Sequence, residues 1–229
     1  MSFGNSQEAL KARRFLNEGE VEISERAFNL LIGGVLLWGF LLNYAMVALF
    51  SDQIVHFLSG AGFIPFLIGY IVLVLIGSAL IARPNPVLSF VGYNLIAVPI
   101  GLLLCVALTG VSTDTIRTAI LLTAIITLSF MIVSMIFPAF FLSLGRVLLF
   151  SLLFTMLGEL FSLIFFRGRS LFYEWIYAGI FSLYIGYDWA RANTCARTVN
   201  NAIDLSASLY LDIINLFLRL VEILSRHRD

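Results

Sequence analysis

The chain has 229 residues, of which 60% are hydrophobic and 12% are charged, whereas a soluble domain is about 45–50% apolar and about 25% charged. So apolar a chain excludes a soluble enzyme and a disordered protein, because one core of this size cannot bury that much apolar side chain. The 14 basic residues balance 14 acidic ones, which excludes the basic surface of a nucleic-acid-binding protein. The composition therefore predicts a protein embedded in a lipid bilayer.

Three parts follow one another along the chain. Residues 1–26 are polar and lack the apolar stretch and cleavage site of a signal peptide, so we expect a polar cytosolic segment. Residues 27–224 are predicted to form the membrane domain, and 225–229 a short polar tail. Cys105 and Cys195 lie far apart, with neither the spacing of a metal site nor that of a disulfide framework.

The membrane domain is predicted to contain seven helices. A membrane-spanning helix needs about 20 apolar residues, whereas a spanning strand is about 9–11 residues long and alternates in polarity. Seven segments have the helical length: 27–50, 61–82, 87–109, 115–137, 143–166, 171–190 and 200–223. Polar residues and prolines separate them, at Ser51–Asp52, Arg83–Pro84–Asn85–Pro86, Asp114, Pro138, Arg167–Gly168–Arg169 and Arg191–Ala192–Asn193. The predicted fold is an all-α integral membrane protein with seven transmembrane helices.

Basic residues give the predicted orientation, since they gather on the cytosolic side of a membrane. With the N-terminus in the cytosol, eight basic residues lie inside and six outside. Four of them precede the first segment, and the 51–60 loop after it has none. We therefore expect a cytosolic N-terminus and, after seven spans, an external C-terminus. The compact chain with short loops favours a bacterial cytoplasmic membrane over a eukaryotic endomembrane.

Three carboxylates fall inside the predicted spans, where an ionisable group is costly and usually faces the interior of the helix bundle. Asp212 lies near the centre of the seventh segment, on a polar stripe with helical spacing that runs from Asp204 to Arg226. Its other supporting members are Ser208, Asn215, Arg219 and Glu222. The stripe predicts a central helix that faces other helices or water. The structural alternative is a packing seam, in which Arg219 pairs with Glu222 or Asp212 and Asn215 bonds a neighbouring helix.

The other two carboxylates have different settings. Asp188 lies near the end of the sixth segment, beside Trp189, and could be either part of an ion pathway or an interfacial carboxylate. Glu159 lies inside the fifth segment without a charged neighbour in sequence. It is either a structural hydrogen-bonding residue or part of a pathway.

Two motifs near the C-terminus resemble those of the transmembrane Bax inhibitor motif family, also called the Bax inhibitor-1 family. They are Tyr187–Asp188 and the run Ser208–Phe217, which reads SLYLDIINLF and contains Asp212. The two aspartates are 24 residues apart (212 minus 188), as expected for that family's pair. The resemblance implies seven helices with the last enclosed by the other six. It also implies a pH-sensitive calcium leak, with the aspartates as sensor and gate and Arg83 as a candidate latch on Asp188.

The chemistry of a buried aspartate pair suits this implication. Two carboxylates in a medium of low dielectric constant cannot both ionise cheaply, so we expect the pair to share a proton. Calcium normally takes six to eight oxygen ligands. The two carboxylates, Asn215 and nearby tyrosines supply too few for a tight cage. We therefore expect weak, transient binding of calcium as a transported ion and no cofactor.

Several other classes compete with this interpretation. An intramembrane aspartyl protease has one aspartate in a Tyr-Asp motif, as here, but its second should follow Gly-x-Gly, and Asp212 follows Leu209–Tyr210–Leu211. A retinal protein needs a lysine in a span, and the chain's one lysine is Lys11. With no catalytic nucleophile or phosphate loop visible, we expect no enzyme. The main rival is a non-conducting interaction protein that regulates other membrane proteins, for example in cell stress.

Overall fold

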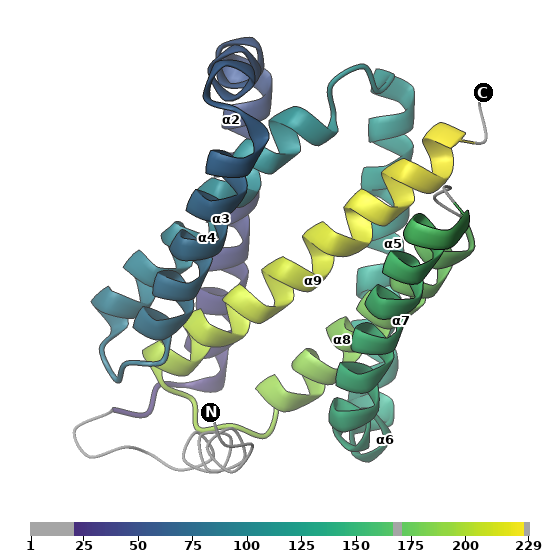
Figure 1. The fold of residues 1–229 in the computed structure, drawn as a ribbon. Coiled ribbons are helices and arrows are strands. Elements are labelled where there is room, and N and C mark those ends of the chain that lie inside the picture. The colour runs from purple at the N-terminus through teal and green to yellow at the C-terminus, as the bar shows by residue number, and fades with distance from the viewer. Residues whose placement is uncertain (1–20, 167–170, 227–229) are drawn as a thin grey trace. The chain divides into compact units, whose positions relative to one another are not determined.

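A computed structural model describes residues 21–166 and 171–226, and the regular elements in these ranges are all helices, without strands (Figure 1). Seven long helices match the seven predicted segments, most of them to within three residues at each end. The eight helices are α2 (Glu25–Ala61), α3 (Phe63–Ile81), α4 (Pro86–Ala107), α5 (Thr113–Ile136), α6 (Pro138–Ser143), α7 (Gly145–Phe166), α8 (Leu171–Ala192) and α9 (Val199–Arg226). The predicted break at 167–169, most of the N-terminal segment and the last three residues lie outside the described ranges.

The first predicted boundary is wrong. Helix α2 continues through Ser51 and Asp52 to Ala61 and has 37 residues, about 55 Å at 1.5 Å per residue. This exceeds the roughly 30 Å of a bilayer's hydrocarbon core, so part of α2 can extend into water, where polar residues do not end a helix. The break falls at Gly62, whose φ of 87° is a conformation that favours glycine.

A short helix that the sequence did not predict follows α5. Pro138 does mark a break, since α5 ends at Ile136, but it also begins α6, where proline is tolerated because the first helical N–H needs no partner within the helix. With six residues, α6 is far too short to give the signal of a membrane span.

Side-chain caps fix several helix starts. Asn85 accepts hydrogen bonds from the backbone N–H groups of Val87 and Leu88, at 2.9 and 3.2 Å, and so caps α4. Ser24 caps α2 and Ser112 caps α5 in the same way, each with one bond of 3.2 Å. The Asn85 cap explains why α4 begins directly after a polar residue that the sequence predicts as a break.

Five helices of the described residues, α2, α3, α4, α5 and α7, are long and apolar enough to cross a membrane. Helices α8 and α9 have the length, with 22 and 28 residues, but carry more polar and charged side chains. Five of the seven predicted spans therefore have the composition of lipid-facing helices, and the remaining two are the helices that contain the aspartates.

The described chain divides into two compact units. The first comprises Met1–Thr109 and Thr194–Ala207. In it α4 packs against both α2 and α3. Tyr93 of α4 is fully buried and donates a hydrogen bond to the backbone oxygen of Val35 in α2, at 2.9 Å. The start of α9 joins this unit, because Ser206 donates to the backbone oxygen of Ile32 at 3.3 Å.

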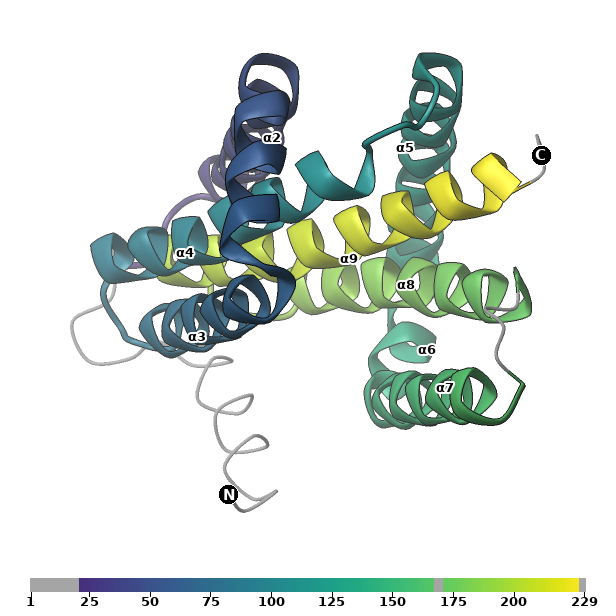
Figure 2. The same cartoon turned by 45° about the horizontal axis from the view of Figure 1, so that its top comes forward.

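The second unit comprises Gly110–Asn193 and Ser208–Asp229. Helices α5, α6 and α7 each pack against α8, so α8 is the helix that these three share in the second unit (Figure 2). Phe141 of α6, Leu148 of α7 and Ile185 of α8 are among its most deeply buried side chains. Both aspartates and Glu159 belong to this unit, whereas Arg83 belongs to the first.

Candidate functional site

The second unit brings Asp188 of α8 and Asp212 of α9 together. Both are buried, with 5% and 8% of their surface exposed. Their carboxyl groups lie close enough to interact electrostatically. Two buried carboxylates cannot both ionise cheaply, which is the reason to expect one proton on the pair. The fold therefore brings together two buried acids that are 24 residues apart in sequence (212 minus 188).

One positive charge lies beside this aspartate pair. Nη1 of Arg191 is 3.1 Å from Oδ1 of Asp188, one turn earlier on the same helix. If the pair holds one proton, it carries a single negative charge, which Arg191 balances. Oδ2 of Asp212 is buried and has no hydrogen-bond partner within the described residues. Tyr184 lies on the same side of α8, close enough for its hydroxyl to interact electrostatically with both carboxyl groups.

Two glycines let neighbouring helices approach α8 next to Asp188. A Cβ atom at Gly186 would lie 2.6 Å from Cδ1 and 3.0 Å from Cζ of the Phe141 ring in α6, with Cε1 closer still. A Cβ atom at Gly145 of α7 would lie 2.9 Å from Cε2 of Tyr187. Either Cβ atom would lie closer to an aromatic ring than side-chain contacts tolerate, so the packing around the aspartate pair depends on the absence of these methyl groups.

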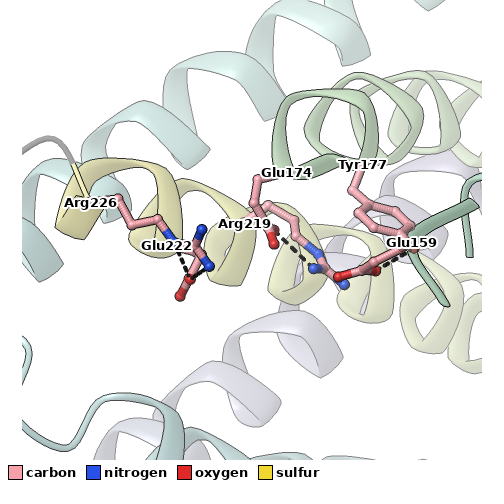
Figure 3. Close-up of polar contacts among 6 residues, drawn as sticks. All are labelled: Glu159, Glu174, Tyr177, Arg219, Glu222 and Arg226. Atoms are coloured by element: carbon pink, nitrogen blue, oxygen red, sulfur yellow. Dashed lines mark hydrogen bonds and ion pairs between the residues drawn. The ribbon is translucent and has the colours of Figure 1, made fainter. Parts of the chain in front are cut away.

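A second polar cluster joins α7, α8 and α9 (Figure 3). We call it the Arg219 cluster; it consists of Glu159, Glu174, Tyr177 and Arg219. Arg219 donates from Nη1 to Oε2 of Glu174 at 2.9 Å, and its guanidinium carbon lies 4.1 Å from the centre of the Tyr177 ring. The hydroxyl of Tyr177 donates to Oε2 of Glu159 at 2.8 Å. Glu159 is thus hydrogen-bonded to the helix that also carries Asp188.

The pairing expected for a packing seam is wrong in this cluster. Arg219 forms its ion pair with Glu174 of α8 rather than with Glu222 or Asp212. Glu222 pairs instead with Arg226, at 2.7 Å, four residues later on α9. An i, i+4 pair of this kind lies on one helix face, and it leaves Arg219 available to bond across to α8.

The remaining residues of the polar stripe are buried or half-buried. Ser208 and Asn215 are half-buried, and Asp204 is buried. Asn215 donates from Nδ2 to the backbone oxygen of Leu211 at 2.8 Å, a bond within its own helix rather than to a neighbour. Arg83, the candidate latch, is exposed in the turn after α3, and its backbone oxygen accepts a hydrogen bond of 3.4 Å from Ser89.

Four residues near the site had no predicted role: Arg191, Glu174, Tyr177 and Tyr184. Each could have been found by helical spacing, because Arg191 lies three residues after Asp188. The other three repeat at intervals of three to seven along the same face of α8. In the described ranges, no three or more histidine, cysteine or acidic side chains come together as a metal site would require. The aspartate pair can supply only part of a calcium shell.

Comparison with protein families identifies the relatives of this chain. The family described as "Inhibitor of apoptosis-promoting Bax1" matches residues 21–229, which is nearly the whole chain and includes both aspartates. A comparison with curated proteins gave no match. The several long apolar helices agree with an integral membrane protein. The chain belongs to the Bax inhibitor-1-like family of α-helical membrane proteins.

Proposed function

We propose that the protein is a pH-sensitive cation leak, with calcium as the favoured ion, whose closed state is held by the hydrogen-bonded pair of Asp188 and Asp212. The observation that carries this proposal is the close approach of two buried carboxyl groups from different helices. Buried acids inside a membrane protein indicate an ion or proton pathway by default, because their burial is costly and they are usually kept only where function needs them.

The charge of the site changes with pH in a direction that can be worked out. With one shared proton, the pair and Arg191 together are neutral. When the pH rises and this proton leaves, two carboxylates face each other and the site gains one negative charge. It then attracts a cation, and repulsion between the carboxylates favours separation of α8 from α9. Such a protonation step can bias a two-state element only if the two states differ in their affinity for the proton.

We extend the proposal to the topology. All seven long helices cross the membrane, with α9 enclosed by the others and the N-terminus in the cytosol. Every described residue of α9 is buried or half-buried, which supports an enclosed helix. The polarity of α9 supports the same conclusion, because so polar a helix would not face lipid. The membrane we propose is a bacterial cytoplasmic membrane. The protein would bind calcium and protons transiently, would need no cofactor and would catalyse no reaction.

Two arginines are candidates for the latch on Asp188. Arg83 is the residue that the family resemblance implies. Arg191 already pairs with Asp188 from the same helix. We propose that Arg191 balances the charge of the closed pair, and that Arg83 engages Asp188 only after the shared proton has left.

Calcium uptake into liposomes that contain the purified protein, from about pH 5 to 8, tests the proposal. Asparagine is a neutral mimic of a protonated aspartate and can still form one hydrogen bond to its neighbour. The Asp212→Asn protein should therefore lose its pH response, and its flux at every pH should match that of the wild type at the acid end. Asp188→Asn should also flatten the response. Asp114→Asn, an exposed acid at the start of α5, is the matched control and should behave as the wild type.

The alternative function has its own outcome in this experiment. If liposomes with the wild-type protein take up no more calcium than empty ones at any pH, the leak is refuted. The non-conducting regulatory protein would then be preferred, with the polar stripe serving to pack helices. If the wild type leaks and both asparagine variants keep its full pH response, the gate does not involve this pair.

A further inference from the structure

The Arg219 cluster is a second concentration of charge in the same unit, and the proposed gate does not use it. Glu174 is 2% exposed, which makes it the most deeply buried acid in the described residues, and Arg219 is 29% exposed. The guanidinium of Arg219 lies between the carboxylate of Glu174, at 2.9 Å, and the face of the Tyr177 ring, at 4.1 Å from the ring centre. Glu159 completes the cluster from α7 through its bond to the Tyr177 hydroxyl (Figure 3).

The Glu174 carboxylate and the face of the Tyr177 ring together form surroundings that attract a cation. Carboxylates attract cations in channel pores, and the face of an aromatic ring attracts a cation through its quadrupole. Two acids and one arginine leave the cluster with a formal charge of minus one. The cation that occupies this position is part of the protein: a guanidinium tethered to α9. Because arginine stays charged at every physiological pH, a pH change does not remove its charge.

Arg226 provides a contrast on the same helix. Its partner, Glu222, is on α9 itself, and both side chains are about a third exposed, at 30% and 37%. This pair bridges no helices and encloses no deeply buried acid. Arg219 instead bonds from α9 to an almost inaccessible carboxylate on α8. Removal of Arg219 would therefore leave a deeply buried acid without its cation, whereas removal of Arg226 would not.

We propose that Arg219 is a tethered plug on the cation pathway, a role that rests on the proposed leak function. Its guanidinium holds the position between Glu174 and Tyr177 where a passing cation would bind. The pathway along α9 then has two restrictions, Asp212 and Arg219, which are seven residues apart (219 minus 212), or about 10 Å along the helix. The aspartate pair sets the pH response, and Arg219 limits the flux once that pair has opened.

The test compares Arg219→Ala with Arg226→Ala in calcium-uptake liposomes, at the pH where the wild type leaks most. Arg219→Ala should raise the flux several-fold and retain the pH response, and Arg226→Ala should leave the flux unchanged. Guanidinium chloride at about 1–20 mM should return the flux of Arg219→Ala toward that of the wild type, since the free ion can occupy the vacated position. The same additions should leave the wild type and Arg226→Ala unaffected.

A stability measurement in detergent gives a readout that does not depend on conduction. Arg219→Ala leaves Glu174 buried without its cation, so its Tm should fall by about 6–20 °C, and guanidinium should recover part of the loss. Should that variant fail to fold, the double variant Arg219→Ala with Glu174→Gln removes the uncompensated charge. It should also show raised flux, but neither its flux nor its Tm should respond to guanidinium.

The outcomes separate this inference from the proposed function. A folded Arg219→Ala protein with the flux of the wild type overturns the plug and leaves the leak standing. Raised flux that guanidinium suppresses equally in Arg219→Ala and in the double variant also overturns it, because the suppression would not involve Glu174. Guanidinium could stabilise Arg219→Ala while neither the wild type nor any variant takes up calcium. The leak and the plug would then both be refuted, and only a cation-binding position beside Glu174 would be supported.

Discussion

Gly186 should be the glycine whose replacement by alanine most directly disturbs the packing behind Asp188. The new methyl group would lie 2.6 Å from Cδ1 of Phe141 and closer still to Cε1. Phe141 cannot easily give way, because its ring is 2% exposed and meets Phe130 and Phe140 edge to face, at centroid distances of 6.3 and 5.3 Å. Either α6 moves away from α8 or α8 shifts, and a shift of α8 moves the adjacent Asp188.

The magnitude follows from a comparison with Gly179 on the same helix, where an added Cβ meets nothing within 4 Å. Both alanines gain the helix propensity that glycine lacks, about 0.8–1.0 kcal/mol. Gly186→Ala alone also pays for overpacking, which costs about 1–3 kcal/mol. The propensity gain cancels between the two variants, so their difference should be that overpacking cost. At about 2–4 °C per kcal/mol, Gly186→Ala should unfold about 2–12 °C below Gly179→Ala.

Thermal unfolding in detergent, followed by circular dichroism at 222 nm, measures this difference. Gly179→Ala should be as stable as the wild type or slightly more so. The reasoning is refuted if the two alanine variants unfold within about 1 °C of each other, which would mean that Phe141 adjusts without cost. Where Gly186→Ala is less stable but folded, its calcium flux should show an altered pH response, because the spacing of the aspartate pair has changed.

Two further predictions concern the first unit. Gly92→Ala should destabilise the contact between α3 and α4 by about 1–3 kcal/mol, because the added methyl would lie 3.0 Å from the backbone nitrogen of Ile81 and still closer to the backbone oxygen of Gly77. Gly69→Ala, with nothing within 4 Å, is the control, and equal Tm values would contradict the reasoning. Asn85→Ala removes both cap bonds of α4 and should cost about 1 kcal/mol, measured as a lower Tm. Asn85→Asp, which keeps an accepting oxygen, should retain most of the stability.

The sequence predicts helices well where apolar length is the signal and less well where a boundary is local. All seven long helices were predicted from runs of apolar residues. The end of α2 was predicted 11 residues too early (61 minus 50), because Ser51 and Asp52 stop a span but not a helix. The true boundary depends on the positive φ of Gly62, and one glycine among 17 is not distinguishable by composition.

The candidate site was also predictable from the sequence only in part. Helical periodicity predicted the polar stripe on α9, and the family motifs singled out Asp188 and Asp212. The partner of Arg219 was not predictable, since it depends on which helix faces which. Arg219 pairs with Glu174, 45 residues away in sequence, whereas spacing within α9 had pointed to Glu222. Periodicity assigns a residue to a face of its own helix, and tertiary packing decides what that face meets.

In the topology that we propose, the two least apolar long helices, α8 and α9, place charged side chains inside the membrane. Helix α9 carries Asp212 and Arg219, and each lies beside a group on α8: the first is close to Asp188, and the second forms an ion pair with Glu174. In the proposed closed state, a shared proton joins the first pair. Isolated in lipid, either helix would expose costly charges, so each becomes compatible with the membrane only beside the other. Loss of the shared proton weakens the match at Asp212 but not the one at Arg219. Opening should therefore begin at the aspartate pair, while the Arg219 cluster still holds α8 and α9 together.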